Sequence, residues 1–300
     1  MIKNNIDFSS FFKKANLFSS LLFISSIVFI VFKGLNYGID FKGGTLIEIR
    51  AENINLNISD IRSTLRNFNI GDINVKEFGK KGDYLIKIEN AENKDLIPKL
   101  KKKLIENLQS EINFRRVEKV GPKVSSELLK SGLIAISLSL GAMLFYIWIR
   151  FEWQFSLGSI LAIFHDVIIT IGIFSMLSLE INLSIIAAVL TIVGYSMNDT
   201  VVIYDRIREN LSKYNKMKID EISNLSINET LSRTIITSVT TLLALFSIFL
   251  LGGEILKGFS FAMIIGVFIG TYSSIFVATP ILKYFNVNFE TMQKDDNHNV

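Results

Sequence analysis

Six apolar runs divide this chain, and they constrain its fold more than any other feature of the sequence. The fourth run, Leu183–Tyr204, has 22 residues, which as a helix extend about 33 Å and can cross a bilayer. Lipid offers no water to bond the backbone, so each run is expected to be a helix. The six runs are Leu17–Phe32, Leu129–Ile149, Phe155–Leu179, Leu183–Tyr204, Thr234–Leu251 and Phe259–Leu282.

The first run has two interpretations. A basic N-terminal segment followed by an apolar stretch is also typical of a secretory signal peptide. However, Lys33–Tyr37 contains no small-x-small cleavage site, and five more apolar runs follow. We therefore expect residues 1–35 to form a cytoplasmic N-terminus and an uncleaved first transmembrane helix.

Residues 36–128 differ from the rest, because charged and apolar residues alternate there over short distances. Period-two alternation predicts strands, and apolar residues three or four apart predict helices. The order strand–helix–strand–strand–helix–strand is that of an α+β ferredoxin-like (βαββαβ) domain. The expected strands are Gly44–Arg50, Ile73–Phe78, Tyr84–Glu89 and Asn113–Val120, and the expected helices are Ile58–Phe68 and Ala91–Leu108.

Basic residues set the orientation. Six spans place both termini on one side, and the opposite short loops hold only Lys257 among basic residues. By the positive-inside rule both termini are cytoplasmic, and the 36–128 domain is extracytoplasmic. We expect α-helical spans two to six within residues 129–282, with a cytoplasmic loop at 205–233 and a cytoplasmic tail at 283–300.

Asp199 is an ionisable residue inside the fourth run, about six residues from the charged end at Asp205. A carboxylate at lipid depth is costly unless it is protonated, paired or hydrated, so it marks an ion or proton path by default. The structural alternative is a polar cluster in which Asn198 and Thr200 bond to neighbouring helices. We favour the functional interpretation, because an ionisable group is a costly way to hold helices together.

His165 and Asp166 lie near the middle of the third run. On a helix they point about 100° apart, so at most one of them faces a given neighbour squarely. One interpretation is that they form a second polar site for proton or ion coupling beside Asp199. The other is that they make a hydrogen bond that fixes helix packing. The sequence favours neither interpretation.

Arg233 stands at the head of the fifth run. It could reach the depth of Asp199, and an opposite charge within about 4–6 Å would hold that carboxyl group ionised. On the residues alone, a positive-inside anchor at the lipid headgroups is the favoured interpretation.

The sequence argues against enzyme chemistry. It has no cysteine and two histidines, which excludes thiolate chemistry and a histidine-rich metal centre. Gly38–Thr45 lacks phosphate-loop spacing and precedes a strand, so we expect a tight turn rather than a nucleotide site. The net charge of +4 comes without a basic-aromatic stripe for nucleic acid. We expect no catalytic triad, cofactor or metal.

Four motifs are spread over the whole chain. They are Gly38-Ile39-Asp40-Phe41-Lys42-Gly43-Gly44-Thr45, Val120-Gly121-Pro122, His165-Asp166-Val167 and the block from Gly194 to Glu209. Together they resemble the SecF branch of the SecD/SecF family of protein-export membrane proteins, within the resistance-nodulation-division superfamily. The last block is highly specific for that branch. One departure is Ser125, where many relatives have glycine, and we expect only a local effect at the hinge before the second span.

The resemblance implies one half of a transporter in the inner (plasma) membrane of a bacterium, the other half being SecD. With the accessory protein YajC, the SecDF complex would associate with the SecYEG channel. It would use the proton gradient, or sodium in some bacteria, to draw preproteins outward after the SecA ATPase has pushed them through. Asp199 matches the family's intramembrane acid, and Arg233 matches the arginine used with it. Gly38, Asp40, Gly43, Gly44, Gly121 and Pro122 belong to the structural motifs.

Two other functions remain open. In one, the chain is a passive scaffold whose outer domain chaperones emerging chains while Asp199 merely packs. In the other, it is half of a small-molecule or lipid exporter of the same superfamily. An outer domain of about 90 residues leaves little room for a ligand cleft.

Overall fold

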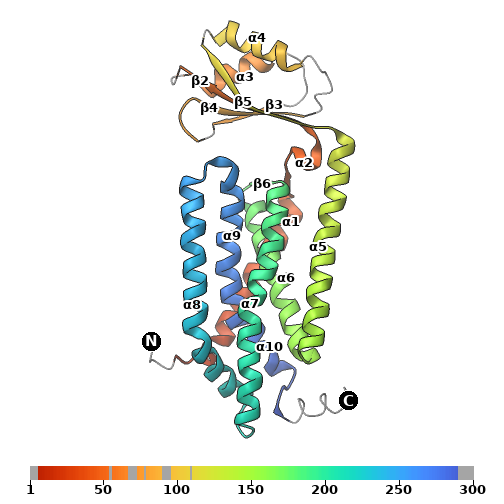
Figure 1. Cartoon of the computed structure of the whole chain (residues 1–300), viewed down its shortest axis with the longest axis vertical. Coiled ribbons are helices and arrows are strands. Elements are labelled where there is room, and N and C mark those ends of the chain that lie inside the picture. Colours follow the sequence, from red (N-terminus) through yellow and green to blue (C-terminus); the bar gives the residue numbers. More distant parts are fainter. Residues whose placement is uncertain are drawn as a thin grey trace. The chain divides into compact units, whose positions relative to one another are not determined.

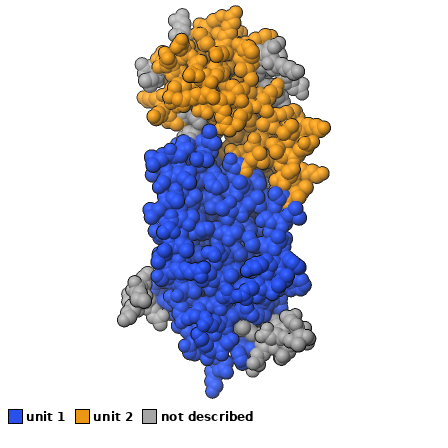
Figure 2. Space-filling view, in the orientation of Figure 1, with its two compact units in different colours: residues 1–36, 135–179, 184–300 blue, residues 37–134, 180–183 orange. Residues whose placement is uncertain are grey.

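A computed structural model describes residues 6–53, 56–66, 73–77, 79–89, 96–108 and 110–289. The chain divides into two compact units (Figure 2). The helical unit comprises residues 1–36, 135–179 and 184–300, and the sheet unit comprises residues 37–134 and 180–183. The sheet unit thus holds most of the predicted outer domain and, in addition, a short segment from between two membrane spans.

Six helices are long and apolar enough to span a membrane, as the sequence predicts (Figure 1). Some of the bounds differ by several residues from the apolar runs. The helices are α1 (Phe12–Lys33, after the 3-10 turn η1, Ser9–Phe11), α5 (Pro122–Arg150), α6 (Trp153–Met176), α7 (Leu183–Lys213), α8 (Ile219–Leu251) and α9 (Glu254–Ser273), which continues through a π-helical turn η2 (Ser274–Ala278) into α10 (Thr279–Tyr284).

Two of these helices extend well beyond their apolar runs. We expected residues 205–233 to form a loop. Instead α7 continues to Lys213 and α8 begins at Ile219, so most of these residues are helical. That prediction was wrong because hydropathy detects only the lipid-facing part of a helix.

The sheet unit contains four antiparallel strands in the order β3-β4-β2-β5. The helices α3 (Ile58–Arg66) and α4 (Leu96–Leu108) lie on one face of this sheet (Figure 1). The strands are β2 (Gly44–Ala51), β3 (Ile73–Glu77), β4 (Asp83–Ile88) and β5 (Ile112–Val120). Strand and helix order agree with the prediction, while Phe68, Phe78 and residues 91–95 lie outside the described residues.

Period-two and period-3.6 patterns explain the core of the sheet unit. Ile47 and Ile86 come from one face of the sheet, and Ile61 and Leu100 come from the helices that cover it; all four are fully buried in one cluster. The short strands β1 (Asn36–Tyr37) and β6 (Glu180–Ile181) pair with each other, and α2 (Ile39–Lys42) is a single helical turn.

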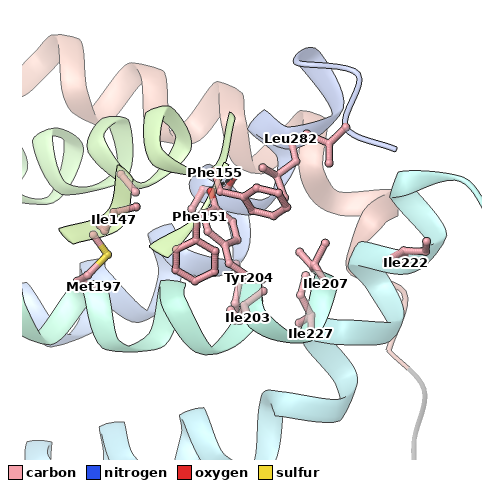
Figure 3. Close-up of a cluster of buried hydrophobic side chains, with 14 of the residues drawn as sticks. Ile147, Phe151, Phe155, Met197, Ile203, Tyr204, Ile207, Ile222, Ile227 and Leu282 are labelled. Carbon is pink, nitrogen blue, oxygen red and sulfur yellow. Dashed lines mark hydrogen bonds between the residues drawn. The ribbon is translucent and has the colours of Figure 1, made fainter. Parts of the chain in front are cut away.

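An aromatic cluster fixes how α5, α6 and α7 meet in the helical unit (Figure 3). The rings of Phe155 and Tyr204 lie edge to face with centroids 5.0 Å apart, and Phe151 lies 6.2 Å from Tyr204. The Tyr204 hydroxyl donates to the Ala278 carbonyl at 2.8 Å. Lipid is as apolar as these side chains, so shape and hydrogen bonding specify the packing more than apolar burial does.

Candidate functional site: a buried polar network

Asp166 lies midway along α6 and is fully buried. Its Oδ2 accepts hydrogen bonds from Ser196 Oγ of α7 at 2.5 Å and from Ser273 Oγ of α9 at 2.7 Å. Its Oδ1 lies 2.9 Å from Nδ1 of His165. One carboxyl group therefore joins three helices, at a depth where an unpaired polar group is costly.

His165 bonds Asp166 through one ring nitrogen. The side chain is buried, and among the described residues its Nε2 has no hydrogen-bond partner. The ring stacks on Phe23 of α1, with centroids 6.4 Å apart. The two side chains contact different helices, His165 contacting α1 and Asp166 contacting α7 and α9, and they also form a hydrogen-bonded dyad with each other.

Asp199 of α7 is 3% exposed. Its Oδ2 accepts a long hydrogen bond of 3.4 Å from Thr271 Oγ1 of α9. The Thr271 hydroxyl also lies 2.8 Å from Ser238 Oγ of α8. Among the described residues, Asp199 is thus held by one long hydrogen bond, in contrast to the three short contacts at Asp166.

Thr200 follows Asp199 and extends the network along α7. Its hydroxyl lies 2.8 Å from Ser274 Oγ, which also donates to the Gly270 carbonyl at 2.8 Å. Residues 271–274 therefore supply hydroxyls to both carboxyl groups and to Thr200. The α9 segment is the element that connects the two acids.

Gly266 and Gly270 permit α7 and α9 to approach this closely. A Cβ at Gly270 would lie 2.9 Å from Ser196 Cβ, and one at Gly266 would lie 2.2 Å from Ile192 Cγ1. The Gly-x-x-x-Gly spacing places both glycines on one face, as in tightly packed membrane helices. The π-helical turn η2 follows, and such turns frequently occur at functional sites.

Two predicted site residues lie outside this network. Asn198 and Arg233 are both exposed on the surface of the chain. Arg233 is close enough to Asp199 to act on it electrostatically. Among the residues that the structure describes, however, no ion pair joins the two.

Sequence reasoning missed the hydroxyl donors. Ser196 and Ser273 bond Asp166, and Thr271 bonds Asp199. A signal was present in the sixth apolar run, where Gly266-x-x-x-Gly270 is followed directly by Thr271-Tyr272-Ser273-Ser274. Four hydroxyl side chains beside a helix-packing motif in lipid indicate a polar contact with another helix.

The charged end of the Gly194–Glu209 block forms ion pairs at the end of the bundle. Those pairs are Arg150–Asp205 at 2.8 Å, Glu152–Arg208 at 2.9 Å and Arg206–Glu229 at 2.6 Å. The Glu152 carboxylate is only 6% exposed. These contacts join α7 to the α5–α6 connection and to α8, which explains why the polar residues there remain helical.

The glycine-rich motif forms α2 followed by Gly43 and Gly44, where we expected a tight turn. Gly43 has φ 79° and Gly44 has φ 130°. A Cβ at Gly44 would lie 2.6 Å from the Ile88 carbonyl oxygen, so both the dihedral angle and the space require glycine. Within the same motif, the Asp40 carboxylate accepts a hydrogen bond from Leu183 N at 2.9 Å.

Gly121 and Pro122 lie where β5 ends and α5 begins. Close to them, Ser125 is buried, and its hydroxyl donates to the Ile39 carbonyl at 3.3 Å and to the Gly121 carbonyl at 3.2 Å. Ser125 therefore contacts the glycine-rich motif directly and acts beyond the hinge to which we had confined it.

Six helices that are long and apolar enough to span a membrane, two of which carry the buried carboxyl groups of Asp166 and Asp199, and a separate sheet unit that follows the first span in sequence define a polytopic membrane protein with an α+β domain. A family profile described as "Protein export membrane protein SecD/SecF, C-terminal" matches residues 100–288, and the "SecD/SecF GG Motif" matches residues 28–53. The chain belongs to the SecD/SecF family of protein-export membrane proteins.

Relatives match almost end to end. The chain is 46% identical to a protein translocase subunit SecF of Rickettsia bellii over 292 residues, covering 96% of both. It is 41% identical to that of Cereibacter sphaeroides, covering 98% of this chain and 93% of the relative. The crystal structure of SecDF from a Thermus species, described as a translocon-associated membrane protein, superposes with a TM-score of 0.87 at 35% identity. The match covers 95% of this chain but only 39% of that longer one.

Proposed function

We propose that this chain is the SecF subunit of a SecDF complex, which uses the proton gradient to assist preprotein export through the Sec pathway. The observation that carries the proposal is Asp199, a carboxyl group 3% exposed at lipid depth, in a chain that SecF subunits match along its length. A buried acid with few partners can change its protonation without dismantling a network.

The two buried carboxyl groups, those of Asp166 and Asp199, have different roles. Asp166 receives strong hydrogen bonds from two serines and lies beside His165, so it holds α6, α7 and α9 in register. Asp199 has one long contact to Thr271 and is the group that exchanges a proton. The Thr271–Ser274 segment lies between them and links the charge state of Asp199 to helix packing around Asp166.

The partner surface lies on the exposed side of this site. Asn198 and Arg233 are polar, exposed, and carried on membrane helices beside Asp199. Lipid is a poor environment for both side chains. SecD therefore covers them, and Arg233 pairs with Asp199 when the helices shift during the cycle.

The remaining assignments follow from the family and from the charge distribution. Both termini face the cytoplasm, and the sheet unit is a ferredoxin-like domain on the outer side of the inner membrane. The proposed partners are the SecYEG channel, YajC and the SecA-driven pathway, and the proposed substrates are unfolded preproteins. One charge crossing the potential is worth about 2.3 kcal/mol per 100 mV, which shifts a two-state equilibrium about fiftyfold.

The test replaces Asp199 with asparagine in vesicles that contain SecD and the channel. Asp199→Asn should abolish export that depends on the gradient, while the protein still inserts and copurifies with SecD. Asp205→Asn is the control, because it removes an acid of the same helix that is exposed and paired with Arg150. Wild-type export by Asp199→Asn would exclude the proton mechanism, and export unchanged by an uncoupler added after translocation begins would favour a passive scaffold.

A further inference from the structure

We propose that Asp40 is a positioning residue that fastens the start of α7 to the sheet unit, so that movement of α7 is delivered to that unit. The inference rests on the proposed function and adds the route by which the sheet unit is moved. It concerns residues 180–183, which belong to the sheet unit although they lie between two membrane spans.

Contacts with the glycine-rich motif and with β4 hold this segment. The Gly38 amide donates to the Ile181 carbonyl at 2.8 Å. The Leu183 amide, the first of α7, donates to Asp40 Oδ2 at 2.9 Å. Lys87 of β4 lies 3.7 Å from the Glu180 carboxylate and is 13% exposed. We call these contacts the α7 clasp.

The clasp is built into the glycine-rich motif. A Cβ at Gly38 would lie 2.6 Å from Glu180 Oε1, so a larger residue there would displace the end of the Glu180 side chain. The α2 turn then directs Asp40 toward Leu183, and Ser125 holds that turn from the other side through the Ile39 carbonyl at 3.3 Å. A carboxylate beside a helix N-terminus is stabilised by the helix dipole and by the free amides there.

Helix α7 connects Asp199 to the clasp and transmits a displacement from one to the other. It runs without interruption from Leu183 to Lys213, and Asp199 lies sixteen residues along it, about 24 Å from the clasp. A continuous helix transmits a shift or rotation along its axis more faithfully than a flexible loop. A change at Asp199 therefore displaces Leu183, and the clasp passes that displacement to the strands.

The first experiment separates the clasp from the proton site. In the complete complex in vesicles, Asp40→Ala should lower gradient-dependent export about fivefold, the factor by which losing a cap of typical strength shifts an equilibrium, and leave uncoupler-resistant export unchanged. Asp40→Asn keeps a hydrogen-bond acceptor at this position and should retain most of the gradient-dependent export. Lys42→Gln, which removes an exposed charge from the same motif, is the control. If Asp40→Ala matches wild type, or lowers both kinds of export equally, the inference is wrong.

The second experiment exploits the absence of cysteine from the chain. The double variant Lys87→Cys/Glu180→Cys should lose gradient-dependent export, and bridging the two thiols with a short crosslinker should restore it. Failure to restore export, or complete arrest on crosslinking, would show that the clasp has to open and would overturn the inference. Asp199→Asn is measured in parallel, because wild-type export by that variant would refute the proposed function rather than the clasp.

Discussion

Replacing Gly270 with alanine tests whether close contact between α7 and α9 assembles the polar network. The added Cβ would lie 2.9 Å from Ser196 Cβ and 3.2 Å from Ser196 Cα, and one of these two atoms is backbone. Carbon atoms prefer separations of about 3.5–4.0 Å, so the helices must separate by roughly 0.6–1 Å. That displacement takes the 3.4 Å bond from Thr271 of α9 to Asp199 of α7 beyond hydrogen-bonding range, and it stretches the 2.8 Å contact between Thr200 and Ser274 to the limit of that range or beyond.

The energies can be estimated. Alanine gains up to about 1 kcal/mol in helix propensity over glycine. Overpacking costs about 1–3 kcal/mol, and a weakened hydrogen bond to a buried carboxyl group costs a further 1–3 kcal/mol or so. The net destabilisation is therefore about 1–6 kcal/mol, which should appear as a lower melting temperature of the purified protein in detergent.

A matched control is available in α5. Gly141 is also inside a membrane helix, but nothing lies within 4 Å of an added Cβ there, so Gly141→Ala should be neutral or slightly stabilising. A second-site change sharpens the test, because Ser196→Gly removes the opposing Cβ and should partly rescue Gly270→Ala, whereas Ser196→Ala should not. Equal melting temperatures for Gly270→Ala and Gly141→Ala would refute the packing argument.

Two further predictions concern ion pairs. Arg50 donates two hydrogen bonds to the Asp83 carboxylate, at 2.5 and 2.6 Å, and holds the pKa of Asp83 below its usual value of 3.8. A carboxyl group whose pKa is lower in the folded state than in the unfolded state stabilises the fold at pH values above the unfolded-state pKa, so Asp83→Asn should destabilise the sheet unit at pH 7 by up to about 1 kcal/mol, the range of a partly exposed ion pair. The difference from wild type should shrink below about pH 4, measured as the urea concentration at which β4 amides lose protection; a constant difference down to pH 3 would contradict the assignment. At the charged end of the bundle, Glu152→Gln should lower the melting temperature, because it leaves Arg208 poorly paired, whereas Asp220→Asn in the exposed pair with Lys283 should have little effect.

The spans could be predicted because lipid imposes a length and a composition on every helix that crosses it. The strand and helix order of the sheet unit could be predicted because a half-buried strand alternates and a half-buried helix repeats every three or four residues. The polar extensions of α7 and α8 could not. Their stability comes from pairs such as Arg206–Glu229 and Asn210–Ser226, between residues 23 and 16 positions apart, which no local pattern reveals.

The site was predicted only in part for a related reason. Asp199 and Asp166 are visible in the sequence because an acid inside an apolar run is anomalous wherever its partners lie. The partners themselves are serines and threonines, which are common in membrane helices, and Ser273 reaches Asp166 across 107 positions of sequence. The cost of an unsatisfied carboxyl group guarantees that donors exist, but only tertiary packing determines which hydroxyls they are.

The contrast between the two acids is the physical basis for assigning their roles. Asp166 is held in place by donors on three helices, so a proton arriving there would have to break bonds that also fix the packing. In the part of the chain that the structure describes, Asp199 has a single long hydrogen bond, Asn198 beside it in sequence is exposed, and the exposed Arg233 acts on it electrostatically. A change of charge at Asp199 therefore acts first on the surface that a partner covers, and only then, through Thr271 and the following serines, on the network around Asp166. Coupling in that direction requires the network to be stiff and Asp199 to be loosely held, which is the arrangement that the hydrogen bonds show.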